Sequence, residues 1–299
     1  MNNSIAEQKT AVITGATFGI GKATALALGK LGINLILIGR NERAGIRIAE
    51  RINARPDAGQ AAFLKADISS QKQIHYLADA INSSHKQVDI LINNAGARFD
   101  EYGKSQDGLE RTFATNHIGH FLLTCLLLEK LLNAPAARVI TISSSAHSYS
   151  NPGSSWQLQR NNYNRSIAYG NSKLANIIFS HELARRLKKT HITSNSMHPG
   201  GVASRFASNN GLWSWIRHIA YHTIKREIVF AAKAAETIVY LAVSPDVAGI
   251  TGKYFYRQEE VQSAPISYDP NVAHDLWKLS IELTSLNEDI GKVWSILNP

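Results

Sequence analysis

The sequence has a single cysteine and no apolar run long enough to cross a bilayer. Because Cys125 is alone, no internal disulfide can form, and we expect a reducing compartment. The longest apolar stretch, residues 118–128, is interrupted by His120 and is shorter than the roughly 20 residues that span a membrane. The polar start, residues 1–9, lacks the apolar middle of a secretory signal. These absences predict a cytoplasmic protein with no transmembrane segment.

Acidic residues are the minority charge, 23 Asp+Glu against 32 Lys+Arg, which gives a net charge of +9. The basic residues are scattered, and their one cluster, residues 185–189, falls at an expected helix C-terminus, where the helix dipole favours cations. No aromatic-interleaved basic motif accompanies the charge, so we expect no nucleic-acid partner. With 44% hydrophobic residues, the chain can bury one large core, which predicts a single domain over residues 1–299.

Short aliphatic runs alternate with helix-period segments between residues 10 and 256. This alternation predicts an α/β fold, a doubly wound parallel sheet of Rossmann type with about seven strands and helices on both faces. Ligands bind such sheets at the carboxyl ends of the strands. The expected strands are 10–14, 33–39, 61–65, 88–93, 137–143, 192–198 and 253–256. The expected helices are 19–31, 42–54, 71–84, 108–132, 168–188 and 228–244.

Two long connections stand outside this alternation, residues 148–165 and 203–226. Connections of this length are more often functional than idle. The second contains Trp213 and Trp215, and its apolar content predicts a lid over a hydrophobic substrate, with Trp213 in contact with it. A helix resting on a membrane surface and a subunit contact remain alternatives. Residues 257–299 are expected to pack on the domain as a C-terminal extension.

A glycine-rich turn follows the first expected strand, with Gly15, Gly19 and Gly21 placed before a helix. Such a turn lets backbone N–H groups approach a pyrophosphate at the helix N-terminus. Its position between a strand and a helix predicts a dinucleotide site. Between these glycines, Thr17, Phe18 and Ile20 would also contact the dinucleotide.

Arg40 directly follows the second expected strand, at a position where chains that bind an unphosphorylated ribose usually carry an acidic residue. A guanidinium can pair with a 2'-phosphate, so we predict NADP(H) as the cofactor. Asp67, which precedes Ile68, could contact the adenine or cap the following helix. The turn of Asn94, Ala95 and Gly96 would let the backbone pass close to a flat ligand.

Tyr169 and Lys173 stand four residues apart, on one face of an expected helix. A nearby cation lowers the pKa of a phenol, so this pair could exchange a proton with a substrate oxygen. Tyr221 and Lys225 have the same spacing, but they lie in the tryptophan-containing connection. The Tyr169 pair follows a strand that ends in three consecutive serines, residues 143–145, and we prefer it for that reason.

One serine of this run could hydrogen-bond the same substrate oxygen, and Asn116 could hold a water that relays protons to the lysine. His147 and His198 lie near the expected crevice, and either could touch substrate or simply pack. We retain His147 as a candidate substrate contact. His117 and His120 are spaced like a metal pair, but no third ligand of suitable spacing follows, so we expect no metal site.

These motifs occur in one order along the chain and together resemble the short-chain dehydrogenases/reductases over about residues 9–256. Residues 115–124 and 168–176 are similar to the retinol dehydrogenase-like branch. The motif residues are Thr14, Gly15, Gly19, Gly21, Asn93, Asn94, Ala95, Gly96, Asn116, Ser144, Tyr169, Lys173, His198, Pro199 and Gly200.

The resemblance implies roles for four side chains: Tyr169 as proton donor, Lys173 on the nicotinamide ribose, Ser144 on the substrate oxygen and Asn116 in the relay. It also implies that the backbone after Pro199 contacts the cofactor. The further contacts there would be Gly200, Val202 and Ser204; this serine stands where a threonine is common.

The same resemblance implies hydride transfer between the nicotinamide and a hydrophobic carbonyl or alcohol, such as a retinoid, a steroid, or a long-chain or aromatic aldehyde or ketone; with the cofactor inferred from Arg40, the predicted protein is an NADP(H)-dependent oxidoreductase. It implies a homodimer or homotetramer as well. Because a fold does not guarantee chemistry, an NADP(H)-binding regulatory or interaction module with little turnover is the alternative.

Overall fold

The computed structural model describes residues 8–153, 155–202, 228–229, 231–286 and 292–297. Its main sheet has eight strands in the order β3-β2-β1-β4-β5-β6-β9-β10. The strands are β1 (Thr10–Thr14), β2 (Asn34–Gly39), β3 (Ala61–Lys65), β4 (Ile90–Asn93), β5 (Arg138–Ile142), β6 (Thr193–Met197), β9 (Tyr254–Tyr256) and β10 (Glu259–Glu260). All pairings are parallel except that of β9 with β10.

The doubly wound α/β fold is confirmed, and the sheet has one strand more than the seven expected. The additional strand, β10, is two exposed glutamates paired antiparallel with β9, so it has no apolar pattern by which the sequence could show it. Strand β1 lies between β2 and β4. The strand order therefore reverses beside β1, and this is where a doubly wound sheet forms its ligand crevice.

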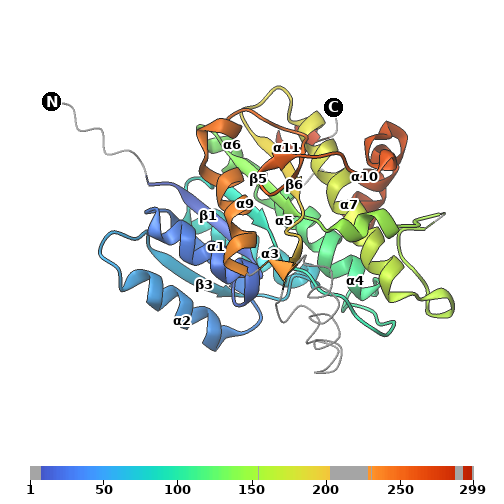
Figure 1. Cartoon of the computed structure of the whole chain (residues 1–299), viewed down its shortest axis with the longest axis horizontal. Coiled ribbons are helices and arrows are strands. Elements are labelled where there is room, and N and C mark those ends of the chain that lie inside the picture. The colour runs from blue at the N-terminus through green and yellow to red at the C-terminus, as the bar shows by residue number, and fades with distance from the viewer. Residues whose placement is uncertain (1–7, 154, 203–227, 230, 287–291, 298–299) are drawn as a thin grey trace.

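Helices cover both faces of the sheet. One buried cluster joins α1 (Gly19–Lys30), α2 (Glu42–Asn53) and α9 (Ala231–Val243) to the strands, and Figure 1 shows α1 and α9 side by side in front of the sheet. The other cluster contains residues of α3 (Gln71–Ser84), α5 (Gly119–Leu126) and α7 (Arg165–Arg186). Since both faces are covered, strands such as β1 are buried along their whole length.

The single helix expected over residues 108–132 is wrong, because this segment is divided. Gly108 has a positive φ of 78°, and the carboxylate of Glu110 accepts the N–H groups of Thr112 and Phe113 at 2.7 and 2.9 Å. The helical part therefore begins only after this acidic cap. It consists of α4 (Arg111–Phe113), the π-helical turn η1 (Ala114–Ile118), α5, and α6 (Leu128–Asn133).

The expected lid, residues 203–226, lies outside the described residues, and so do Ser204 and Trp213. Two short strands flank it, β7 (Gly201–Val202) and β8 (Ile228–Val229), and they pair in parallel. The helix expected over 228–244 therefore begins later than predicted, as α9. Short 3-10 helices complete the connections: η2 (Ser145–Tyr149), η3 (Arg160–Asn162), η5 (Pro245–Val247) and η6 (Pro265–Tyr268).

The C-terminal residues form α10 (Pro270–Thr284) and α11 (Lys292–Leu297). Trp277 of α10 is buried and stacks on Phe179 of α7, with ring centroids 6.0 Å apart. The guanidinium of Arg186 lies 4.3 Å from the Trp277 ring and donates to the backbone carbonyl of Leu297. These contacts attach the C-terminal helices to α7. Within the described part of the chain, no helix combines the length and apolarity needed to cross a membrane.

Candidate active site

The glycine-rich turn lies at the carboxyl end of β1, as the sequence predicts. Gly15 has a φ of +67°, and a Cβ on Gly21 would lie only 2.4 Å from the carbonyl oxygen of Gly15. Helix α1 starts at Gly19, with no side chain capping it and no acidic residue in its first turn. The first N–H groups and the positive end of the helix dipole are therefore directed at this turn. The arrangement fits a dinucleotide pyrophosphate.

The loop after β4 is joined to this turn. The Oγ1 of Thr14 accepts the backbone N–H groups of Asn94 and Ala95, each at 2.9 Å. In return, Nδ2 of Asn94 donates to the carbonyl of Thr14 at 2.8 Å. Gly96 follows directly in this loop. The glycine-rich turn after β1 and the loop after β4 are therefore hydrogen-bonded to each other. Together they form one surface beside the point where the strand order reverses.

Arg40 and Asp67 meet at the carboxyl ends of β2 and β3. Nη1 of Arg40 lies 4.0 Å from Oδ2 of Asp67, and the arginine side chain is 62% exposed. The other carboxylate oxygen of Asp67 accepts the N–H and the hydroxyl of Ser69 at 2.9 and 2.8 Å. Asp67 thus stabilises the turn before α3, whose N-cap is Ser70, and Ile68 is buried. The exposed guanidinium remains accessible to an anion at this edge.

Helix α7 carries the tyrosine and the lysine that the sequence pairs. Its N-cap, Asn164, accepts the N–H groups of Ser166 and Ile167. Lys173 is 2% exposed, and its Nζ donates to the carbonyl of Ile142 at 3.0 Å and lies 5.6 Å from the centroid of the Tyr169 ring. Burial disfavours the ammonium form and lowers the pKa of Lys173 to about 7.

The phenol of Tyr169 shares a side-chain hydrogen bond with Ser144. Burial raises the pKa of Tyr169 to about 12, and the Ser144 hydrogen bond and the charge of Arg98 oppose this rise. The hydroxyl of the neighbouring Ser143 instead donates to the backbone carbonyl of Lys173 on α7, at 2.7 Å. Ser145 is exposed. Among the three serines, Ser144 is therefore the one placed against the phenol.

Asn116 lies in the π-helical turn, between the loop after β4 and α7. Its carboxamide accepts the N–H of Ala97 at 2.8 Å and donates to the carbonyl of the same residue at 2.9 Å. Nδ2 also donates to the hydroxyl of Ser172, the residue before Lys173, at 2.9 Å. The side chain thus holds the loop after β4 against the helix that carries Tyr169.

Two histidines near the crevice use their ring nitrogens within the protein. The Nδ1 of His147 lies 2.8 Å from the carbonyl of Ser144, and its Nε2 accepts the N–H of Ala264 at 3.1 Å. This geometry favours the packing alternative for His147. The Nδ1 of His198 accepts the N–H of Gly200 at 3.3 Å, so the imidazole supports the turn of Pro199 and Gly200. Val202 follows in β7.

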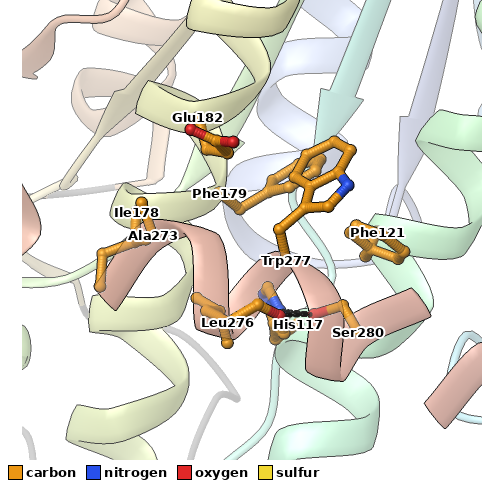
Figure 2. Close-up of a pocket in the computed structure, with 9 residues that line it drawn as sticks. All are labelled: His117, Phe121, Ile178, Phe179, Glu182, Ala273, Leu276, Trp277 and Ser280. Atoms are coloured by element: carbon orange, nitrogen blue, oxygen red, sulfur yellow. Dashed lines mark hydrogen bonds between the residues drawn. The ribbon is translucent and has the colours of Figure 1, made fainter. Parts of the chain in front are cut away.

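His117 and His120 have separate partners. Figure 2 shows His117 directed at α10, where its Nε2 lies 3.0 Å from Oγ of Ser280. The small pocket around it is lined by aromatic residues of α5, α7 and α10, including Phe121, Phe179 and Trp277. His120 instead contacts Thr14, on the nucleotide turn, at 2.9 Å. The two imidazoles therefore do not share a ligand site.

The structure brings three further residues to this centre that the sequence motifs do not assign to it. Arg98 carries a charge that acts on Tyr169. Tyr254 of β9 is buried, and burial and the charge of Tyr169 both raise its pKa. His120 joins two parts of the site. The position of Arg98, two residues after the Asn-Ala-Gly turn, was the one available signal. Tyr254 is separated by a long stretch of sequence from Tyr169, and His120 from Thr14.

Comparisons with known proteins show what this chain is similar to. A family model described as short chain dehydrogenase matches residues 9–215. Retinol dehydrogenase 14 of Mus musculus is 35% identical, over 91% of this chain and 84% of the relative. A short-chain dehydrogenase of Brassica napus, TIC 32 B, described as chloroplastic, is 36% identical over 93% and 89%. The crystal structure of an uncharacterised protein from Mycobacterium paratuberculosis superposes with a TM-score of 0.71 at 30% identity, covering 93% and 94% of the two chains.

Proposed function

This chain belongs to the short-chain dehydrogenase family, in the branch of the retinol dehydrogenases, and we propose that it transfers hydride between NADP(H) and a hydrophobic carbonyl or alcohol. The family assignment supports an oxidoreductase that acts on alcohols or carbonyls. We propose three further points: that the cofactor is NADP(H), that the substrate is hydrophobic, and that individual residues have the roles given below.

The observation that carries the proposal is the cluster of Ser144, Tyr169 and Lys173. Ser144 hydrogen-bonds the phenol, and the Lys173 ammonium lies 5.6 Å from its ring. The cluster lies beside the carboxyl end of β5, on the same edge of the sheet as the glycine-rich turn. A pure nucleotide-binding module has no need of a half-buried phenol with a cation beside it.

A bound nicotinamide supplies hydride to the substrate carbon, or accepts it from there. During reduction, the Tyr169 hydroxyl donates its proton to the substrate oxygen, and Ser144 donates a hydrogen bond to that oxygen. The phenolate left on Tyr169 is favoured by the positive charges of Lys173 and Arg98. Oxidation reverses these steps, with the phenolate as the base. Asn116 positions the loop and the helix on either side of this centre.

Arg40 supports NADP(H) over NAD(H). It occupies the end of β2, it is 62% exposed, and its guanidinium can form paired hydrogen bonds to a 2'-phosphate. Asp67, 4.0 Å away, is turned toward Ser69 through one carboxylate oxygen and would orient the arginine through the other.

For the substrate we propose a retinoid, a steroid, or a long-chain or aromatic aldehyde or ketone. The tryptophan-containing residues 203–226 and the names of the relatives support this class. A cytoplasmic location and a homodimer or homotetramer remain predictions from the sequence, and one relative is described as chloroplastic. Cell fractionation would test the location, and light scattering would test the oligomeric state.

The test is turnover by the purified protein with NADPH or NADH and a panel of aldehydes and ketones. We expect Tyr169→Phe to lower kcat by at least about 100-fold, because the proton donor is lost, while NADPH binding remains. Tyr76→Phe is the matched control, because Tyr76 is an exposed tyrosine on α3, outside the proposed site, and it should leave kcat unchanged. Tight NADPH binding by the wild type without turnover on the whole panel would instead support the regulatory module.

A further inference from the structure

His120 is a fully buried imidazole that contacts both the nucleotide turn and the π-helical turn of Asn116. It is 0% exposed. Its Nε2 lies 2.9 Å from Oγ1 of Thr14, and its Nδ1 lies 2.9 Å from the backbone carbonyl oxygen of Asn116. The first contact joins residues 106 positions apart. His120 therefore links β1, where the glycine-rich turn begins, to the residues that pack against α7.

The partners of the imidazole determine its tautomer. A carbonyl oxygen only accepts hydrogen bonds, so Nδ1 carries the proton and donates it to Asn116. Nε2 is then an acceptor, and the hydroxyl of Thr14 donates to it. The same hydroxyl oxygen accepts the N–H groups of Asn94 and Ala95. The carbonyl oxygen of Ile92 lies 3.3 Å from the same Thr14 hydroxyl, but Nε2 of His120, at 2.9 Å, is the nearer acceptor of its proton. With Nδ1 as donor and Nε2 as acceptor, His120 has a single orientation.

Burial keeps this imidazole neutral. Desolvation lowers the pKa of His120 to about 4, the hydrogen bond to Asn116 opposes this, and the charge of Lys173 adds to the lowering. The Nδ1–H tautomer therefore persists across the neutral pH range.

The carbonyl that His120 contacts belongs to the π-helical turn η1. In η1 the backbone bonding shifts to the wider spacing, as the N–H of Gly119 donates to the carbonyl of Ala114. Asn116 lies inside this turn, and Nδ1 of His120, four residues later, lies 2.9 Å from its carbonyl oxygen. The carboxamide of Asn116 is held by Ala97 and Ser172. Asn116 is thus fixed at its side chain by the neighbouring loop and helix, and at its main chain by His120.

We propose that His120 is a positioning residue with two separable functions: Nε2 orients Thr14 in the nucleotide turn, and Nδ1–H orients the carbonyl of Asn116 beside the proton-transfer residues. The inference rests on the proposed function, since it assigns cofactor binding to one side and proton transfer to the other. It differs from a packing role in that each nitrogen affects a different measurable step.

Two substitutions separate the two nitrogens. In His120→Asn the amide reaches the position of Nδ1, so it keeps a donor for Asn116 and loses Thr14. In His120→Gln the amide reaches the position of Nε2, so it keeps an acceptor for Thr14 and loses the Asn116 carbonyl. His120→Leu removes both contacts. His117→Gln is the matched control, since His117 is a neighbouring buried histidine whose partner, Ser280, lies on α10.

The measurements are the NADPH dissociation constant by fluorescence, kcat at saturating NADPH, and Tm. We expect His120→Asn to weaken NADPH binding about tenfold with little change in kcat, and His120→Gln to lower kcat about tenfold with little change in NADPH binding. His120→Leu should show both losses. His117→Gln should lower Tm without either specific effect.

The proposal would be overturned if His120→Asn and His120→Gln both lost NADPH affinity, kcat and Tm to the same extent. A residue that only packs in the core would produce that pattern. Unchanged affinity and kcat in both would overturn it as well. If the wild type binds NADPH but turns over no substrate, the proposed function fails. The ratio of NADPH affinities between His120→Asn and His120→Gln still decides the inference in that case: a ratio near one overturns it, and weaker binding by His120→Asn supports it.

Discussion

The hydroxyl of Ser144 hydrogen-bonds the phenol of Tyr169, whereas the adjacent Ser143 donates to the carbonyl of Lys173 at 2.7 Å. Three consecutive serines thus have three environments. We expect Ser144→Ala to lower kcat about 100-fold, because it removes a donor to the reacting oxygen. Steady-state kinetics at saturating NADPH would measure this.

Ser145→Ala is the matched control, because that exposed side chain lies one residue away, and it should leave kcat unchanged. Ser143→Ala should act mainly on stability, lowering the free energy of unfolding by about 1 kcal/mol through the loss of a buried hydrogen bond. A larger loss of kcat in Ser145→Ala than in Ser144→Ala would contradict the assignment.

Arg40→Asp should reverse the cofactor preference. The substitution replaces a guanidinium at the end of β2 with a carboxylate that repels a 2'-phosphate and can bind the ribose hydroxyls. The ratio of kcat/KM for NADPH to that for NADH is the measurement, and we expect it to fall by at least about 100-fold. Lys65→Asp, at an exposed position on β3, controls for the change of charge. An unchanged ratio in Arg40→Asp would refute the argument for NADP(H).

Arg98→Met should move the pH profile of alcohol oxidation to higher pH. Oxidation needs the phenolate of Tyr169. Arg98 after β4 and Ser144 before η2 act on this phenol, and Lys173 on α7 and Tyr254 on β9 are its other polar neighbours. The charge of Arg98 lowers the pKa of Tyr169. Its removal raises that pKa, so the phenolate forms only at higher pH.

The measurement is kcat/KM for oxidation with NADP⁺ as a function of pH. Arg98→Lys is the control, since it keeps the positive charge and should stay close to the wild-type midpoint. Coincident midpoints for Arg98→Met and the wild type would show that Arg98 does not act on the phenol.

Lys173→Met should stabilise the fold while it removes activity. Burial lowers the pKa of Lys173 from 10.5 to about 7. Between these values the folded chain binds fewer protons than the unfolded chain, so the free energy of unfolding rises as pH increases through this window. The penalty for burying the ammonium is complete below the folded pKa and is absent above the unfolded one.

In the methionine variant this pH dependence should be lost, and the free energy of unfolding near pH 7 should increase by about 2 kcal/mol. Urea denaturation at a series of pH values measures both effects. Lys30→Met, at an exposed helix end, should leave the pH dependence as it is. A wild-type stability that does not rise above neutral pH would contradict the depressed pKa.

Much of the fold follows from local patterns. The strands at 10–14 and 61–65 and the helix at 71–84 have the predicted bounds, because their apolar periodicity extends over whole elements. The division of residues 108–132 was missed, since continuous apolar residues conceal a π-helical turn. The antiparallel edge strand was missed because two glutamates have no strand-like pattern.

The sequence alone determined the elements whose signals are close together along the chain: the glycine-rich turn after β1, the i,i+4 pair of Tyr169 and Lys173, and Arg40 at the end of β2. Only the tertiary structure decided which of three adjacent serines meets the phenol, that Arg98 acts on it, and that His120 joins Thr14 to Asn116. The reason is physical, because helix and strand periodicity are set by neighbours a few residues apart. Contacts such as that of Thr14 with His120 join residues 106 positions apart and exist only once the sheet and its helices have packed.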